Sequence, residues 1–399
     1  MLLQKTTLLL CFLWVGMALS AQTQPVEFRG GGKKLKINQI QVLGTHNSYA
    51  QPVDSNVLAY GDPIFKGLMG MMQQRMTPEQ MLEWKEYHPN EVLMSEGLAY
   101  NHPPLAEQLD AGLRSLEIDV YYDPTGNRFA DPAAYRVMQS KGITQLAPFS
   151  KEGLDQPGFK VLHIADYDFR SHCPTLTGCL SELKTWSDAH PRHVPIFILL
   201  ETKNQGIPLF PNPAQVLPFD ARAFAELDAE VLRVLGRDKV ITPDDVRGHY
   251  PTLEEAVKAH HWPTLAQSRG KFVFLMLTAT DEKGASPYLQ GHPSLEGRAM
   301  FLRSLPGSPH SAFLLLDNSL VRQADIQKYV QAGYLVRTRT DIETYEAKIN
   351  DSTRADAAFE SGAQVISTDF FRPGNKYGTP YVVRIPGGKT ARLNPVNGR

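Results

Sequence analysis

The chain has 399 residues, of which 42% are hydrophobic, with 41 basic and 42 acidic side chains. This hydrophobic content supports a full core and argues against intrinsic disorder. Because the formal net charge is only −1, there is no overall field to attract nucleic acid or another polyanion.

Residues 1–21 have the order of a secretory signal. A lysine precedes an apolar run over 8–19, and small residues follow. The run is shorter than the ~20 residues that span a bilayer. We therefore expect cleavage after Ser20 or Ala21 and export of 22–399, secreted or periplasmic, as a single domain. A retained N-terminal anchor is the alternative.

Two cysteines, Cys173 and Cys179, remain after removal of the signal. In an exported protein, a disulfide that closes a small loop is the expected state. Two free buried thiols are the alternative, which the spacing alone leaves open.

Eight short runs of apolar and β-branched residues recur along the mature chain. The expected strands are 36–43, 115–120, 159–164, 194–200, 271–277, 311–316, 332–338 and 363–368, and the expected helices include 103–112, 174–189, 219–236 and 320–332. Apolar strands alternating with amphipathic helices predict a parallel sheet covered on its outer face. Eight such units predict an α/β fold, the (β/α)₈ TIM barrel. A doubly wound open sheet is the alternative, but it usually has a Gly-rich loop after the first strand, which is missing here.

Two long segments, 49–100 and 202–218, each follow a predicted strand. We expect the first to be a long insertion after the first strand. Because the loops after barrel strands lie at the carboxyl-terminal face, both segments should lie over the mouth of the barrel.

Polar residues stand where the predicted strands end, which is where a barrel of this kind carries its chemistry. They are His46 and Asn47 on the first strand, Glu117 and Asp119 on the second, His163 on the third, Glu201 and Lys203 on the fourth, and Asp317, Arg337, Arg339 and Asp369 on later strands.

Glu117 and Asp119 lie two apart and therefore on one face of their strand. Two carboxylates placed side by side among apolar neighbours repel each other and are costly to bury unless they are neutralised. A divalent cation would do this. Ion pairs with basic neighbours such as Arg114 are the alternative, and this pair alone does not decide between them.

Glu201 favours the cation, because an acid at the end of a central apolar strand is seldom buried without a partner. With Asn47 it completes a set of three carboxylates and one amide oxygen. Such a set suits Ca²⁺ or Mg²⁺ rather than zinc. Lys203 shares the face of Glu201 if the strand persists, and could meet a phosphate oxygen; a solvated loop lysine is the alternative.

His46 and His163 end different strands, which suits a general acid and a general base on opposite sides of a phosphorus atom. A lone histidine is more often structural, but two beside a carboxylate set favour catalysis. His102 lacks such company and is interpreted as structural. The sequence has no Gly-x-Ser-x-Gly elbow, no HExxH, no Walker loop and no paired-cysteine zinc spacing, which excludes those classes.

These residues together resemble the phosphoinositide-specific phospholipase C superfamily, in particular its calcium-dependent bacterial branch. The matching segments are LGTHNSYA (43–50), HPPLAEQLDAGLRSLEIDVYYD (102–123), VLHIADYDF (161–169), ILLETKN (198–204) and QVISTDFF (364–371). The specific signal is the THNSY element combined with the Glu-x-Asp strand.

The resemblance implies that Ca²⁺, rather than Mg²⁺, is bound by Asn47, Glu117, Asp119 and Glu201. In metal-independent relatives an arginine stands in place of Asp119. It also implies that the first histidine, His46, contacts the phosphoryl group, and that His163 is the acid that protonates the leaving group.

The implied reaction is attack of the inositol 2-hydroxyl of phosphatidylinositol on phosphorus, which gives a cyclic inositol phosphodiester and diacylglycerol. The general base stays open between Glu117, Asp119 and His46. The expected substrate contacts are Lys203, Arg337 and Asp369. The fifth predicted strand does not end in the pair of lysines that reads extra ring phosphates in eukaryotic relatives, so unphosphorylated phosphatidylinositol is expected.

A lipid substrate also implies transient contact with a membrane surface. The apolar residues of the 49–100 segment, Phe65, Leu68, Met69, Met71 and Met72, are candidates for such a rim. A buried helix is the alternative, and it is the one we favour from the sequence.

Three other functions stay open. A glycerophosphodiester phosphodiesterase, acting on substrates such as glycerophosphoinositol, shares the barrel and most of these residues, but its motif normally begins His-Arg-Gly where this chain has His46-Asn47-Ser48. A sphingomyelinase-D-like lyase is a variant of the same chemistry. A catalytically silent lipid- or inositol-phosphate-binding protein is the third, and the two histidines argue against it.

Overall fold

The computed structural model describes residues 28, 32–278, 287–388 and 390–398. The expected signal, 1–21, lies outside them. In this part of the chain, no helix combines the length and the apolar character needed to cross a membrane.

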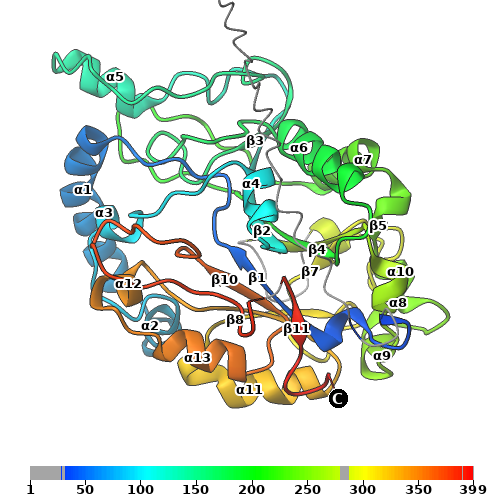
Figure 1. Cartoon of the computed structure of the whole chain (residues 1–399). Helices are drawn as coiled ribbons and strands as arrows, with labels where there is room; N and C mark the ends of the chain where they lie inside the picture. The colour runs from blue at the N-terminus through cyan, green and yellow to red at the C-terminus, as the bar shows by residue number, and fades with distance from the viewer. Residues whose placement is uncertain (1–27, 29–31, 279–286, 389, 399) are drawn as a thin grey trace, which may run out of the picture.

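A curled and mostly parallel sheet forms the centre of the molecule (Figure 1). Its strands are β1 (Ile40–Thr45), β2 (Ser115–Asp123), β3 (Gly158–Val161), β4 (Ile196–Thr202), β5 (Val240–Ile241), β6 (Phe272–Thr278), β7 (Phe301–Leu302), β8 (Phe313–Asn318), β9 (Leu335–Arg339), β10 (Val365–Thr368) and β11 (Arg392–Leu393). Neighbouring strands follow the order β5-β6-β4-β2-β1-β10-β9-β8, and β7 pairs with β6. Arg303, just after β7, forms a parallel bridge with Phe313 of β8, and this closes the ring. The predicted barrel is therefore confirmed.

One of the eight predicted strands is wrong as a barrel strand. The run 159–164 gives β3, which pairs antiparallel with the end of β2. The reason is the length of β2, which continues to Asp123 although its pairing with β4 ends at Val120. The positions between β6 and β8 are instead bridged by β7, and β5 flanks β6. Each of these has only two residues, too few to give an apolar run.

Helices surround the strands (Figure 1). They are α1 (Ser55–Gln73), α2 (Pro78–Tyr87), α3 (Met94–Gly97), α4 (Leu105–Asp110), α5 (Ala133–Ser140), α6 (Leu176–Ala189), α7 (Ala221–Leu235), α8 (Pro243–Arg247), α9 (Leu253–Lys258), α10 (Leu265–Ser268), α11 (Ser319–Gln331), α12 (Tyr345–Ile349) and α13 (Thr353–Glu360). The four expected helices are confirmed as α4, α6, α7 and α11. Side-chain caps fix two of the starts: Thr175 accepts a hydrogen bond from the backbone of Gly178, and Asp220 from that of Ala223.

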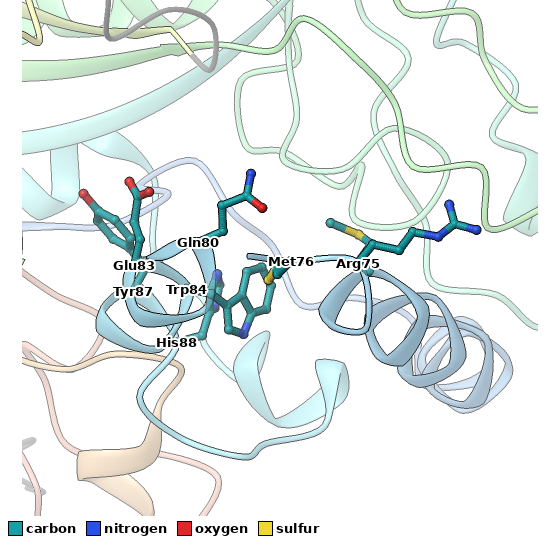
Figure 2. A pocket seen from close by; sticks show the side chains of 8 residues that line it. Arg75, Met76, Gln80, Glu83, Trp84, Tyr87 and His88 are labelled. Atoms are coloured by element: carbon teal, nitrogen blue, oxygen red, sulfur yellow. The ribbon is translucent and has the colours of Figure 1, made fainter. Parts of the chain in front are cut away.

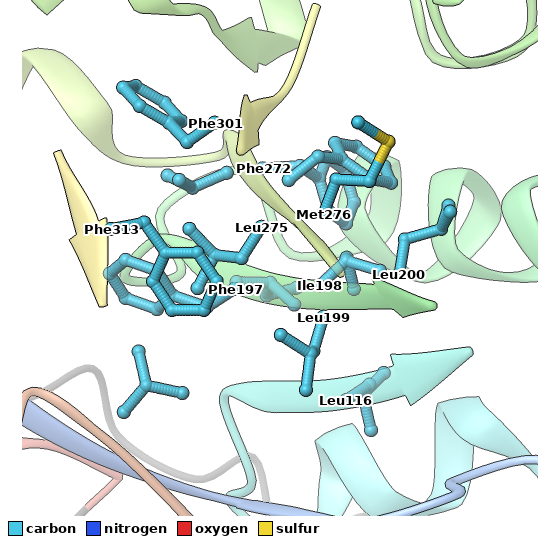
Figure 3. Packing of buried hydrophobic residues seen from close by; sticks show 14 of the residues in the cluster. Leu116, Phe197, Ile198, Leu199, Leu200, Phe272, Leu275, Met276, Phe301 and Phe313 are labelled. Atoms are coloured by element: carbon cyan, nitrogen blue, oxygen red, sulfur yellow. The ribbon is translucent and has the colours of Figure 1, made fainter. Parts of the chain in front are cut away.

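The core of the barrel is built from strands that are buried on both faces (Figure 3). Phe197 and Leu199 of β4, Leu275 of β6 and Phe313 of β8 are almost fully buried in one cluster. Burial on both faces explains the near-continuous apolar runs in the sequence. Every residue of β2 is buried as well, so its acids are exceptions in an apolar setting.

Gly44 is the glycine of the LGTHN element, and it is required by a close approach of two strands. A Cβ atom at this position would lie 2.0 Å from the carbonyl oxygen of Ser115. This contact lets β1 meet β2 directly, and it brings the residues that follow Gly44 next to the acids of β2.

The segment between β1 and α4 carries α1, α2 and α3, which lie beside α12 (Figure 1). Asn318, at the carboxyl end of β8, donates a hydrogen bond of 3.0 Å to the carbonyl of Glu86 in α2. The other long segment reaches α1, where the rings of Phe210 and Tyr60 stack. The α1–α3 segment thus lies at the rim of the barrel mouth.

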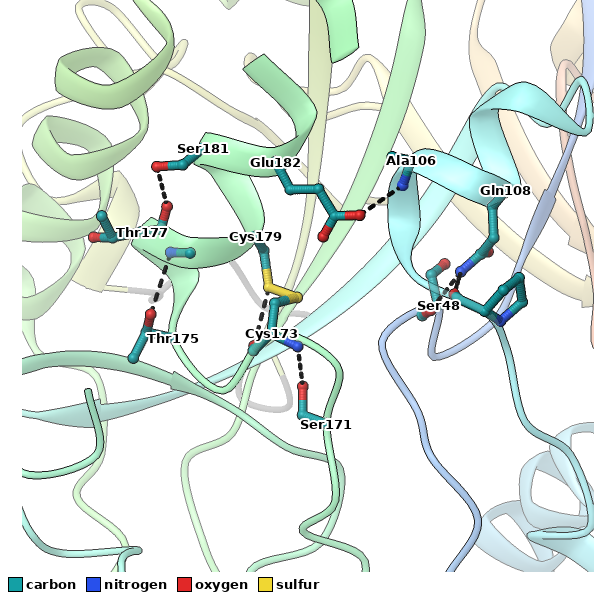
Figure 4. Close-up of a disulfide and its surroundings, with 12 residues drawn as sticks. Ser48, Ala106, Gln108, Ser171, Cys173, Thr175, Thr177, Cys179, Ser181 and Glu182 are labelled. Atoms are coloured by element: carbon teal, nitrogen blue, oxygen red, sulfur yellow. Dashed lines mark hydrogen bonds between the residues drawn. A yellow bond between two sulfur atoms is a disulfide. The ribbon is translucent and has the colours of Figure 1, made fainter. Parts of the chain in front are cut away.

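Cys173 and Cys179 form the expected disulfide at the start of α6 (Figure 4). The bridge anchors the loop that follows β3 to the first turn of a barrel helix. That loop carries His163.

Candidate active site

Three carboxylates meet at the carboxyl end of the barrel. Asp119 and Glu201 are register partners across β2 and β4, and Glu117 stands two residues before Asp119. Oxygen atoms of all three lie within 4.8 Å of one another. Burial raises the pKa of Glu117 to about 8 and raises that of Asp119 above its usual range. Such a cluster needs positive charge to remain ionised.

Lys203 lies against two of these acids. Its Nζ is 2.9 Å from Oδ2 of Asp119 and 3.0 Å from Oε1 of Glu201. Burial acts to raise the pKa of Glu201, but Lys203 outweighs it and lowers that pKa. The predicted position of Lys203 on the face of Glu201 is confirmed, and the residue is no solvated loop lysine.

Arg337 pairs with the third acid, Glu117. Its guanidinium donates one hydrogen bond of 2.8 Å to Glu117 and another to Asp317, and the residue is only 2% exposed. Arg114, the alternative partner for the acids, instead donates to the backbone carbonyls of Leu109 and Leu113.

The residues present fit a hard divalent cation. The side chain of Asn47 is buried, and its Oδ1 atom finds no hydrogen-bond partner within the described ranges. Oδ1 of Asp119 is in the same condition. Buried oxygens without partners are costly, and an oxygen-only set of one amide and three carboxylates is what Ca²⁺ prefers. Asn47, Glu117, Asp119 and Glu201 can therefore hold the cation that the sequence predicts.

His46 lies beside this cluster, with its Nε2 3.9 Å from Oε1 of Glu117. Its Nδ1 is 3.3 Å from Oδ1 of Asp369 and 3.3 Å from Nη2 of Arg339. Burial and Arg339 lower the pKa of His46 to about 3, against the opposing charge of Asp369. Burial acts to raise the pKa of Asp369, but His46, His102 and Arg339 lower it well below its usual range. The Asp369 carboxylate thus lies against Nδ1 of His46, and Nε2 of the ring faces Glu117.

His163 faces His46 from a different element, and the two ring centroids are 6.5 Å apart. Its Nδ1 lies 2.9 Å from Oδ2 of Asp168. The ring is held by the tight turn after β3, in which Asp166 has a positive φ of 66°. The prediction that His163 ends a barrel strand is therefore wrong, although the residue does reach the mouth.

Sequence reasoning missed Asp168 and Tyr100 as members of this site, and it placed Arg339 at a strand end without giving it a role. Asp168 follows His163 by only five residues, but this spacing predicts a contact between them only if the chain turns at that point, which the sequence does not show. Tyr100 lies 53 residues from the side chain it contacts, Asn47, and no sequence pattern connects them. His102, interpreted as structural, donates through Nε2 to the carbonyl of His46 at 2.9 Å and so supports the site.

Replacing Arg337 with methionine should lower the free energy of unfolding by about 3–5 kcal/mol, because Glu117 would be left buried without a counter-charge and the half-buried Asp317 would lose its partner. Urea unfolding measures the loss. Arg222→Met is the matched control, since Arg222 is paired with Glu226 on the surface and its loss should cost at most ~1 kcal/mol. Equal losses in the two variants would show that the buried pair has no special role.

Comparison with known proteins is consistent with this geometry. A family model described as phosphoinositide phospholipase C, Ca²⁺-dependent, matches residues 35–395. A solved calcium-dependent phosphoinositol-specific phospholipase C from a Gram-negative bacterium, Pseudomonas sp, in the apo form is 16% identical, with a TM-score of 0.51 over 91% of this chain and 96% of that one. A structure titled as its myoinositol complex gives 15% identity and a TM-score of 0.50, with the same coverage. A comparison with curated protein sequences finds no match.

The structural likeness supports the barrel fold, and the family match extends over nearly the whole described chain. It covers Asn47, Glu117, Asp119 and Glu201 as well as both histidines. The chain belongs to the Ca²⁺-dependent phosphoinositide phospholipase C family, and it is an enzyme of the phosphodiesterase type.

Proposed function

We propose that the protein cleaves the glycerol–phosphate bond of phosphatidylinositol through attack by the inositol 2-hydroxyl, releasing diacylglycerol and a cyclic inositol phosphate. The observation that carries the proposal is the pair of histidines beside the acidic cluster, each backed by its own carboxylate: His46 by Asp369 and His163 by Asp168. The similar structure titled as a myoinositol complex is consistent with an inositol headgroup as substrate.

His163 supplies the proton for the leaving group. With Nδ1 donating to Asp168, Nε2 of the protonated ring is the atom that can donate to the glycerol oxygen as the P–O bond breaks. The carboxylate of Asp168 fixes this orientation and stabilises the charged ring, as in other imidazole–carboxylate pairs.

His46 is the proposed base: its lowered pKa leaves the ring neutral and able to take up a proton, and Asp369 stabilises the charge that the ring then gains. Glu117 and Asp119 are engaged by Arg337 and Lys203, and a carboxylate bound to a cation is a weak base. With Nδ1 donating to Asp369, Nε2 of His46 is left to take the proton of the 2-hydroxyl while the new O–P bond forms. One proton thus enters at His46 and another leaves from His163.

A bound Ca²⁺ supplies positive charge for the phosphoryl oxygens and lowers the pKa of the attacking hydroxyl. Among the expected substrate contacts, Lys203 lies at the cluster's surface and remains the candidate for a phosphate oxygen. Arg337 and Asp369 are buried against Glu117 and His46, so we propose that they act by holding those two side chains.

Phosphorus NMR tests the reaction. The mature protein is incubated with phosphatidylinositol and, separately, with glycerophosphoinositol. A cyclic inositol phosphate from the lipid is the expected product. Glycerol phosphate as the sole product would instead establish the glycerophosphodiester phosphodiesterase, which the family match does not favour. No turnover of either substrate would contradict the proposed reaction and favour the binding protein.

We also propose that the α1–α2 rim contacts the membrane. Phe65 and Leu68 pack against the core as a buried helix would, but Met71, Met72 and Leu82 are 52%, 49% and 72% exposed. A cavity of about 510 Å³ lies between the end of α1 and α2, and Figure 2 shows the side chains that line it. It is lined by Met72, Arg75, Met76, Gln80, Glu83, Trp84, Tyr87 and His88. A lipid phosphate lies at headgroup depth, so the rim of the mouth is the part that must reach the bilayer.

Met71→Ser combined with Met72→Ser should weaken binding to phosphatidylcholine vesicles by about tenfold, because roughly 1–2 kcal/mol of apolar transfer energy is lost. Vesicle sedimentation in chelator measures it without turnover. Leu393→Ser is the control: Leu393 is exposed too, but β11 pairs with the start of β1, at the far end of the barrel. Equal binding by all three proteins would rule out the rim.

Export through the signal is likewise proposed. The Cys173–Cys179 disulfide supports an oxidising compartment. Amino-terminal sequencing of the protein recovered outside the cytoplasm should begin at Ala21 or Gln22; a start at Met1 would contradict this.

A further inference from the structure

Asn47 differs from the three carboxylates of the proposed cation site, because only one of its two terminal side-chain atoms, Oδ1, can bind a cation. Its Oδ1 accepts, whereas its Nδ2 carries two protons and would repel the metal. The two orientations of the amide differ by a half-turn about one bond. Affinity for the cation therefore depends on whatever fixes that half-turn.

The rest of Asn47 is already fixed. Its backbone has a positive φ of 45°. The amide of Ser48 donates to the carbonyl of Glu117, and the amide of Ala50 donates to the carbonyl of Asn47, each at 2.9 Å. These bonds tie the residue to β2 and leave the side-chain amide as its adjustable part.

Tyr100 holds that amide. Nδ2 of Asn47 donates to the hydroxyl of Tyr100 at 2.6 Å, and both residues are buried. With Nδ2 so engaged, Oδ1 is the atom left without a partner among the residues described. The ring of Tyr100 also lies 5.5 Å from that of His46, so one residue contacts both the cation ligand and the catalytic histidine.

We infer that Tyr100 is a positioning residue for the cation: its hydroxyl fixes the amide of Asn47 with Oδ1 directed to the cation site. Through Tyr100 the segment that carries α1, α2 and α3 is coupled to that site. The inference rests on the proposed ligand set of Asn47, Glu117, Asp119 and Glu201. Residues that orient metal ligands in this way typically change affinity by roughly 10–100-fold when they are altered.

Calorimetric titration of the metal-stripped mature protein with Ca²⁺, without substrate, is the test. Tyr100→Phe keeps the ring and removes the hydroxyl, and it should weaken Ca²⁺ binding by about tenfold. Tyr334→Phe is the matched control. Tyr334 lies just before the amino end of β9, and its hydroxyl donates a hydrogen bond of 2.6 Å to Glu254. The loss of this hydroxyl should leave Ca²⁺ affinity unchanged.

A second background separates orientation from general support. Asn47→Asp has an oxygen at both positions, so a half-turn no longer matters. In that background, Tyr100→Phe should change Ca²⁺ affinity by less than about threefold. The same loss in both backgrounds, or no loss in the first, would overturn the inference. A parent protein that binds Ca²⁺ but does not cleave phosphatidylinositol would overturn the proposed reaction and leave this inference standing.

Discussion

Replacing His163 with alanine should lower turnover of phosphatidylinositol by roughly 10²–10⁴-fold, the usual contribution of a positioned general acid. The glycerol oxygen is a poor leaving group without a proton, and His163 is the histidine paired with Asp168 at 2.9 Å. The same variant should act almost normally on an inositol phosphodiester whose leaving group is p-nitrophenolate. That group departs as an anion, so no acid is needed.

Steady-state rates on both substrates measure the effect as a ratio. Asp168→Asn should give a smaller loss of the same kind, since it weakens the orientation and charge of the ring without removing it. If His163→Ala lost equal factors on the two substrates, the acid would have to be sought elsewhere.

Replacing Asp119 with asparagine should weaken Ca²⁺ binding by more than ~100-fold, because even changes outside the ligand shell typically cost 10–100-fold. Activity at fixed low Ca²⁺ should fall with it. The metal-free protein should be no less stable than the parent. Asp119 lies within 4.8 Å of two other carboxylates, so losing its charge relieves repulsion, and Lys203 keeps Glu201 as its partner at 3.0 Å.

Calorimetry gives the affinity, and thermal unfolding in chelator gives the stability. Asp123→Asn is the matched control on the same strand. Asp123 is buried and accepts hydrogen bonds from the backbone of Gly126 and Arg128, so its loss should lower stability and leave Ca²⁺ affinity intact. Unchanged Ca²⁺ binding in Asp119→Asn would remove Asp119 from the ligand set.

The barrel was predictable because strands buried on both faces are mostly apolar, as β4 is up to Leu200 and β6 up to Leu277. The sequence could not show that 159–164 turns back along β2, because a run of apolar residues carries no strand direction. Nor could it reveal β5 and β7, which each consist of two residues. Their pairing is set by neighbouring strands rather than by their own composition.

The site was predictable to the extent that it sits on strand ends. Alternation along β2 puts Glu117 and Asp119 on one face, and the structure brings Glu201 to them. Which basic side chain pairs with which acid was not predictable. Arg337 and Arg339 are two residues apart on β9, yet Arg337 pairs with Glu117, whereas Arg339 contacts His46 and Asp369. That choice depends on depth along the barrel axis, which spacing does not give.

The most direct test of the account is a paired Ca²⁺ titration of binding and of phosphatidylinositol cleavage on the same preparation. Asn47, Glu117, Asp119 and Glu201 form one site, so calorimetry should give one Ca²⁺ per chain, and the cleavage rate should rise in proportion to its occupancy. Chelator should abolish cleavage. Cleavage that continues undiminished in chelator would contradict the account, because the acidic cluster would then have no role in the reaction.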